Sequence, residues 1–99
     1  MAHDIEQLVG QRVVLDTAGF VLYLGTLSSV LDAGFWLTEA DVHDCREGHA
    51  SAEVYIMNAA VDGITPNRKR VFVLRATVLS VSGLDDIIAE YHTTEGGAV

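Results

Sequence analysis

VVLDTAGFVLYLGTLSSVLDAGFWLTEADV, residues 13–42, is the stretch that decides the fold of this chain of 99 residues. It contains three runs of apolar and β-branched residues, which two turn signals, Ala18-Gly19 and Asp32-Ala33-Gly34, separate. Such runs between glycine-containing turns predict consecutive antiparallel strands. Gly25 lies inside the longest run, residues 20–31, where an interior glycine indicates a sharp bend. The stretch therefore predicts a bent three-strand meander.

Helices are predicted on both sides of this meander. Residues 4–10 carry apolar side chains at the spacing of one helix face and end at a glycine. Residues 52–62 follow Ser51, a good N-cap, and precede Gly63, a common stop signal. A strand over residues 54–57 is the alternative, because this run is partly β-branched. We favour the helix, which would form an insertion between two strands.

The second half of the chain supplies the remaining strands. Residues 71–82 are rich in valine and predict one long strand, or two strands that break near Arg75-Ala76. Residues 67–70 are interpreted as a basic turn before them, and residues 84–91 as a short helix. The predicted fold class is therefore mainly β: a small, strongly bent, five-stranded barrel with an N-terminal helix and a helical insertion.

Length and composition predict one domain that assembles with copies of itself. A chain of 99 residues forms a single domain, for which we expect residues 1–92, with residues 93–99 as a flexible tail. Hydrophobic residues make up 49% of the chain, more than a small lone barrel is expected to bury. We therefore expect a homo-oligomer.

The overall charge argues against strong binding of nucleic acid. The chain has 14 acidic and 6 basic residues, and its net charge of −8 repels a phosphate backbone. The local exception is the basic run Arg68, Lys69 and Arg70, with Arg75 nearby. Several copies of this run on one face of an assembly could still attract phosphate groups.

The single cysteine, Cys45, rules out an intrachain disulfide and is typical of a reducing compartment. The first ten residues do not have the pattern of a signal peptide, and no run of 18 apolar residues occurs. We therefore expect a cytoplasmic protein that does not bind membranes.

Several short motifs resemble the Sm and Sm-like (LSm) family. Gly19 corresponds to the turn glycine of the family, and Tyr23-Leu24-Gly25-Thr26-Leu27 to its aromatic, glycine and leucine positions. Leu74-Arg75-Ala76 is similar to the second motif, with alanine in place of glycine. The resemblance covers residues 4–42 and 70–83 and indicates a divergent member of bacterial or phage type. It implies a ring of subunits that pair their edge strands, which hides those edges.

The resemblance also implies single-stranded RNA as a partner, but two positions depart from the family pattern. The RNA-contacting aspartate of the family falls on Leu31, with Asp32 one residue later, and the base-reading asparagine falls on Phe35. A phenylalanine cannot read a base edge, although it can stack on a base. The family's arginine is retained as Arg75. The candidate nucleic-acid-binding residues are Asp32, Phe35, Arg68, Lys69, Arg70 and Arg75.

A polar loop, residues 43–50, contains side chains that can bind metal. His43 and His49 could reach one ion, with Cys45 between them. No recognised metal-binding spacing is present, so we favour an ordinary polar loop and expect no cofactor. Cys45 also has no recognisable third group that would complete a nucleophilic site, so we expect no enzymatic activity.

The leading hypothesis is a non-enzymatic, Sm-like ring module that associates with RNA. One alternative is an acidic scaffold that binds a protein partner and no RNA, because the base-reading asparagine is missing and the net charge is −8. The other alternative is a small metal-binding protein that uses the loop of His43 and His49.

Overall fold

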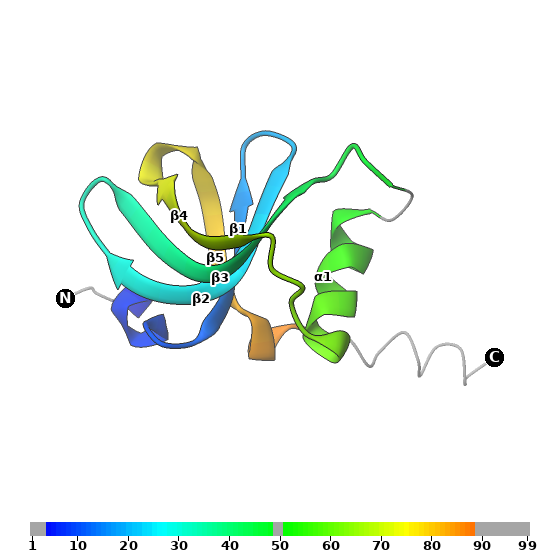
Figure 1. The fold of residues 1–99 in the computed structure, drawn as a ribbon. Helices are drawn as coiled ribbons and strands as arrows, with labels where there is room; N and C mark the ends of the chain where they lie inside the picture. Colours follow the sequence, from blue (N-terminus) through cyan, green and yellow to red (C-terminus); the bar gives the residue numbers. More distant parts are fainter. Residues whose placement is uncertain (1–3, 49–50, 89–99) are drawn as a thin grey trace.

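The computed structural model of the protein describes residues 4–48 and 51–88. A five-stranded antiparallel sheet bends around itself, and one α-helix lies beside it (Figure 1). The order across the sheet is β4-β3-β2-β1-β5, so β4 and β5 form its two edges. The mainly β, bent five-stranded fold predicted from the sequence is confirmed. The strands are β1 (Arg12–Thr17), β2 (Val21–Val30), β3 (Gly34–Asp44), β4 (Arg68–Leu74) and β5 (Val78–Gly83), and the helices are η1 (Asp4–Leu8), α1 (Ala52–Asp62), η2 (Arg75–Thr77) and η3 (Leu84–Asp86), where η denotes a 3₁₀ helix.

The bend of the sheet lies where Gly25 of β2 meets β3. A Cβ atom at Gly25 would lie 3.1 Å from the Cα of Ala40 and 3.1 Å from the carbonyl oxygen of Thr38. The pairing of β2 with β3 shifts register beside this contact, and Glu39 has a φ of 48°. Such an irregularity increases the local twist of a strand pair. The predicted bend at Gly25 is therefore present, and the close approach of the two backbones explains why a glycine is needed.

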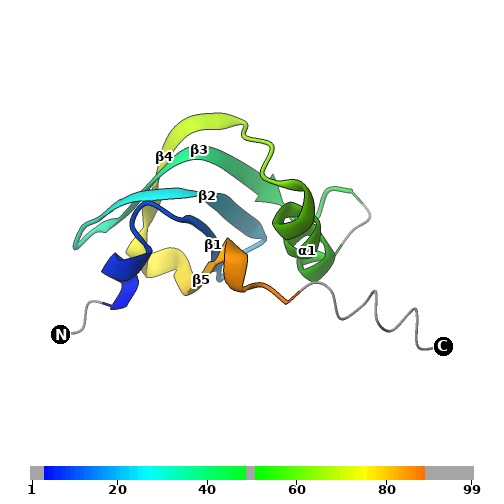
Figure 2. The ribbon, with the colours of Figure 1, turned by 90° about the horizontal axis from the view of Figure 1, so that it is seen from below.

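Apolar side chains pack on both faces of the sheet. In β1, Val13 and Leu15 point to the inner face, and Val14 between them points to the outer face. Helices α1 and η3 cover one end of the outer face, as the view from below shows (Figure 2). The inner cluster consists of Val13, Leu15, Leu27, Phe35, Leu37, Ala40 and Val73, and the outer cluster of Val14, Leu22, Leu24, Ala59 and Leu84.

Helix α1 begins and ends as the sequence predicts. The side chain of Ser51 accepts a hydrogen bond of 3.2 Å from the backbone N–H of Val54. Gly63 follows the helix with a φ of 96°, and its N–H donates to the carbonyl group of Ala59. The helix is confirmed, and the alternative strand over residues 54–57 is wrong. Within the described ranges, no helix has the length and apolar character needed to cross a bilayer.

Three predicted boundaries are wrong. Arg68, Lys69 and Arg70 do not form a turn but begin β4, where they pair with β3. Residues 84–88 contain only the short η3 in place of a longer helix, and residues 89–91 lie outside the described part. The N-terminal helix is a 3₁₀ helix that ends at Leu8. The predicted tail, residues 93–99, also lies outside the described residues, so the predicted domain boundary stays a prediction.

Candidate nucleic-acid interface

Arg75 connects two loops at one end of the sheet. Its Nε donates to the carbonyl oxygen of Asp32 at 3.0 Å, and its Nη2 to that of Leu31 at 2.7 Å. Its backbone N–H donates to the carbonyl oxygen of Ala33 at 2.9 Å. The guanidinium also lies 4.9 Å above the centre of the Phe35 ring. The structure therefore brings together three of the predicted residues: Asp32, Phe35 and Arg75.

Phe35 does not present its ring to solvent. The side chain is only 2% exposed and belongs to the inner core cluster. The neighbouring residue, Gly34, is also tightly packed: a Cβ atom there would lie 2.1 Å from the carbonyl oxygen of Val73. A base cannot stack on Phe35 in this arrangement. The exposed flat group of the site is instead the guanidinium of Arg75.

The basic run lies at the other end of β4 and does not join this cluster. Arg68, Lys69 and Arg70 begin the strand, whereas Arg75 follows its last residue. At about 3.3 Å per residue, Arg70 and Arg75 are roughly 16 Å apart along the chain. The Arg70 guanidinium lies 4.0 Å above the ring centre of Trp36, which in turn packs against Phe72 at 5.0 Å. The six predicted residues thus fall into two separate groups: Asp32, Phe35 and Arg75 at one end of β4, and Arg68, Lys69 and Arg70 at the other.

The metal-binding hypothesis has no support in the described residues. His43 lies in β3, and its ring stacks on Tyr55 with ring centres 3.7 Å apart. Its Nε2 atom is buried without a hydrogen-bond partner in the structure as described. Within residues 4–48 and 51–88, no group of three or more potential ligands is close enough to hold an ion. His49 lies outside these ranges.

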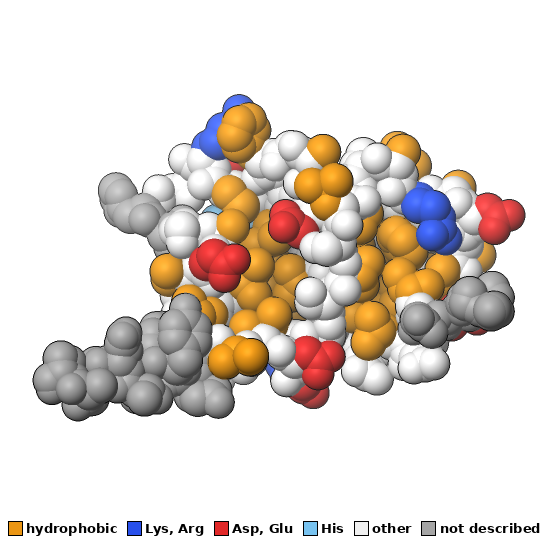
Figure 3. Space-filling model, turned by 180° about the vertical axis from the view of Figure 1, so that it is seen from behind, with side chains coloured by type: hydrophobic (Ala, Val, Ile, Leu, Met, Phe, Trp, Pro, Cys, Tyr) orange, Lys and Arg blue, Asp and Glu red, His pale blue; other side chains and the backbone are white. Residues whose placement is uncertain are grey.

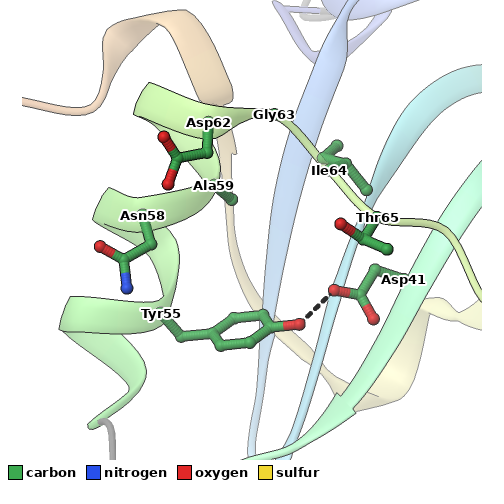
Figure 4. A pocket seen from close by; sticks show the side chains of 8 residues that line it. All are labelled: Asp41, Tyr55, Asn58, Ala59, Asp62, Gly63, Ile64 and Thr65. Carbon is green, nitrogen blue, oxygen red and sulfur yellow. Dashed lines mark hydrogen bonds between the residues drawn. The ribbon is translucent and has the colours of Figure 1, made fainter.

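A buried polar cluster, which the sequence did not reveal, joins α1 to the end of β3. The Tyr55 hydroxyl donates a hydrogen bond to the carboxylate of Asp41, which is 6% exposed (Figure 4). Asn67 donates to the same carboxylate at 3.3 Å and exchanges two hydrogen bonds of 3.0 Å with the backbone of Val42. Burial, together with the hydrogen bond and charge of Asp41, raises the pKa of Tyr55 to about 12.

The pocket beside this cluster is small, and both polar and apolar side chains line it. Its volume is about 190 Å³, and Figure 4 shows Asn58, Asp62 and Thr65 around it. Both oxygens of Asp41 are already hydrogen-bonded by Tyr55 and Asn67, so the carboxylate serves to hold α1 against the sheet.

The loop after β3 does not activate its cysteine. Burial, reinforced by the negative charges of Asp16 and Asp44, raises the pKa of the Cys45 thiol. Side-chain and backbone hydrogen bonds from Arg46 lower the pKa of Asp44 to about 2. A thiol with a raised pKa is a weak nucleophile at neutral pH, because the thiolate is the reactive form.

Comparison with solved structures identifies the fold. The chain is similar to the Sm protein of Pyrococcus abyssii, solved in complex with a uridine heptamer, with a TM-score of 0.56 and 13% identity over 81% of this chain and 92% of that one. It is also similar to the SmAP1 heptamer of P. aerophilum, with a TM-score of 0.54 and 17% identity over 81% of this chain and 86% of that one. No protein-family model and no curated protein matches the sequence. The chain therefore has the Sm fold that its motifs predict.

Proposed function

We propose that the protein is a non-enzymatic, ring-forming module that binds single-stranded RNA. The observation that supports the ring is the state of the two edge strands. In the described part of the chain, β4 and β5 each have a strand neighbour on one side only. Their exposed apolar side chains include Leu74, which is 56% exposed, and Leu79, which is 71% exposed. Pairing β4 of one copy with β5 of the next would bury these side chains and satisfy both edges.

The similarity to a protein that forms a heptamer supports this assembly. Pairing through two different edges is a head-to-tail contact, which closes into a ring when the rotation between neighbours permits it. The predicted homo-oligomer is thus proposed to be a ring.

The RNA-binding site is proposed to centre on Arg75. Its guanidinium is held in place by the carbonyl groups of Leu31 and Asp32, and one of its faces lies against Phe35. The opposite face would stack on a base, because a guanidinium plane is a good stacking surface for unpaired bases. The relative in complex with a uridine heptamer supports this choice of ligand. Phe35 stands where the family has its base-reading asparagine, so we expect little preference between uridine and adenine.

The ring is tested by size-exclusion chromatography with light scattering, which measures the mass in solution. We expect a mass of several subunits for the natural chain, and a shift toward monomer for Leu79→Glu. The control is Val61→Glu on α1, because Val61 is also 71% exposed but lies away from both edges. A natural chain that is monomeric at micromolar concentration would contradict the proposal.

RNA binding is tested by fluorescence anisotropy with oligo-U and oligo-A at low and moderate salt. We expect Arg75→Lys to weaken binding roughly tenfold, because a lysine keeps the charge but has no flat stacking surface. The control is Arg46→Lys, in an arginine that pairs with Asp44 on a different loop. The absence of binding at low salt would remove RNA from the proposal and leave the ring, as the acidic-scaffold alternative expects.

A further inference from the structure

The back of the molecule carries an acidic groove between α1, β5 and η3. Its volume is about 390 Å³, and apolar side chains such as Ile56 and Met57 line it. Figure 3 shows hydrophobic side chains in a hollow of this face, with acidic side chains around it. The acidic residues of the groove are Asp16, Glu53 and Asp86, and none of them forms an ion pair within the described ranges. Three like charges around one hollow favour an occupant that carries cations.

The cations that could meet this groove lie on a single strand. Arg12 and Arg46 form ion pairs, and Arg75 is bound to loop carbonyl groups. In the part of the chain that the structure describes, four basic residues have no carboxylate partner: Arg75, which the loop carbonyl groups hold, and the three that begin the edge strand β4, Arg68, Lys69 and Arg70. Arg70 is held over Trp36, and this contact occupies a face of its guanidinium while leaving N–H donors at the rim.

Successive side chains of β4 and of β5 point to opposite faces of the sheet, and this alternation determines which of the three cations would reach the groove. Val71 of β4 and Val81 of β5 both pack against the inner cluster, whereas Ser80 and Ser82 line the groove on the opposite face. An antiparallel pairing that places Val71 of one copy beside Val81 of the next also places Arg70 beside Ser82. A slip of one residue would place Val71 beside Ser80 or Ser82, which face the groove, so the faces of the two strands would not match, and the stated register is favoured over that slip.

We propose that Arg68 and Arg70 of one copy enter the acidic groove of the next copy and fix the register of the interface. In this register Arg68 extends past Ser82 toward η3, where Asp86 lies. Lys69 lies between the two arginines but on the other face of the strand, so it does not reach the groove. The inference rests on the proposed ring and adds the contact between subunits that sets its pairing.

The experiment compares the concentration dependence of assembly for purified, nuclease-treated variants by light scattering. We expect Arg70→Glu to raise the concentration of half-assembly at least about tenfold at low salt, and Lys69→Glu to raise it less than about threefold. The effect of Arg70→Glu should shrink at high salt, because salt screens exposed charges. Arg68→Glu/Arg70→Glu combined with Glu53→Lys/Asp86→Lys reverses the charges on both sides and should restore assembly. Circular dichroism establishes that each variant is folded.

The outcomes separate this inference from the proposed ring. If the natural chain assembles and Arg70→Glu assembles equally well, the ring stands and the inference is wrong. If Arg70→Glu and Lys69→Glu weaken assembly equally, or if the charge-reversed chain stays dissociated, the inference is also wrong. A natural chain that is monomeric at every concentration overturns the ring and the inference together.

Discussion

Tyr55 on α1 donates a hydrogen bond to the carboxylate of Asp41 on β3, and this contact ties the helical insertion to the sheet. Tyr55→Phe removes the donor and leaves a carboxylate that is only 6% exposed with one side-chain partner, Asn67. We expect a loss of about 1–3 kcal/mol in the free energy of unfolding, measured by urea denaturation. The control is Tyr23→Phe, because the Tyr23 hydroxyl makes no hydrogen bond among the described residues; it should cost about 0.5 kcal/mol or less. Equal losses in both variants would contradict the role of the hydrogen bond.

The same tyrosine should make the protein sensitive to alkaline pH. Its pKa rises from the ordinary value of 10.0 to about 12 in the folded protein, so folding favours the protonated hydroxyl. This contribution to stability is fully present below about pH 10 and is lost as the pH rises through about 12. Ultraviolet absorbance of tyrosinate should show one tyrosine titrating near pH 12, and Tyr55→Phe should abolish that step. A step that persists in the variant would assign it to another tyrosine.

Substitution by alanine should destabilise the protein at Gly34 but not at Gly19. A Cβ atom at Gly34 would meet the carbonyl oxygen of Val73 at 2.1 Å, whereas one at Gly19 would have no neighbour within 4 Å. We expect Gly34→Ala to lower the free energy of unfolding by about 1–3 kcal/mol, because β3 and β4 must separate to admit the methyl group. Gly19→Ala should change it by less than about 0.5 kcal/mol. Thermal or urea denaturation of the two variants is sufficient, and equal stabilities would contradict the close packing at Gly34.

Cys45 should react slowly with alkylating reagents. Burial and the charges of Asp16 and Asp44 raise the pKa of its thiol, which lowers the fraction of reactive thiolate at mildly alkaline pH. We expect iodoacetamide to modify Cys45 several times more slowly than a cysteine in a short unstructured peptide. Asp16→Asn removes one of the charges and should accelerate the reaction by about two- to threefold. Alkylation as fast as in the peptide would show that the thiol is activated.

Local signals in the sequence were sufficient to predict most of the elements. Ser51 and Gly63 mark the ends of α1 with the side chain and the backbone freedom that such ends require. Glycine-containing turns separate the first strands, and Gly25 marks the bend. These features are encoded within a few residues, so they could be identified without knowledge of the tertiary structure.

The start of β4 differs from the prediction because a run of charged residues occurs both in turns and on edge strands. A run of three cations, Arg68 to Arg70, is typical of a turn, yet charged side chains also occur on edge strands, where they discourage aggregation. Whether a strand lies at the edge depends on the order of all five strands, which the local sequence does not show.

The candidate site was predicted only in part for a similar reason. The resemblance to the family names Asp32, Phe35 and Arg75 among the candidate residues, and the structure brings these three together. The burial of Phe35 depends on its packing with the inner cluster, and the bond from Tyr55 to Asp41 joins residues 14 positions apart across a loop and a helix. Neither contact leaves a pattern in the sequence.

The turn between β4 and β5 is only three residues long, Arg75–Thr77, yet it joins the two edges of the sheet. In the proposed ring, which pairs those edges between neighbouring copies, we expect this turn to influence the angle between one subunit and the next. The hydrogen bonds from Arg75 to the carbonyl groups of Leu31 and Asp32 hold the turn in place, and this restricts changes in that angle. We therefore expect that inserting or deleting one residue in this turn would change the angle between neighbouring subunits of the proposed ring, and with it the number of subunits that close it.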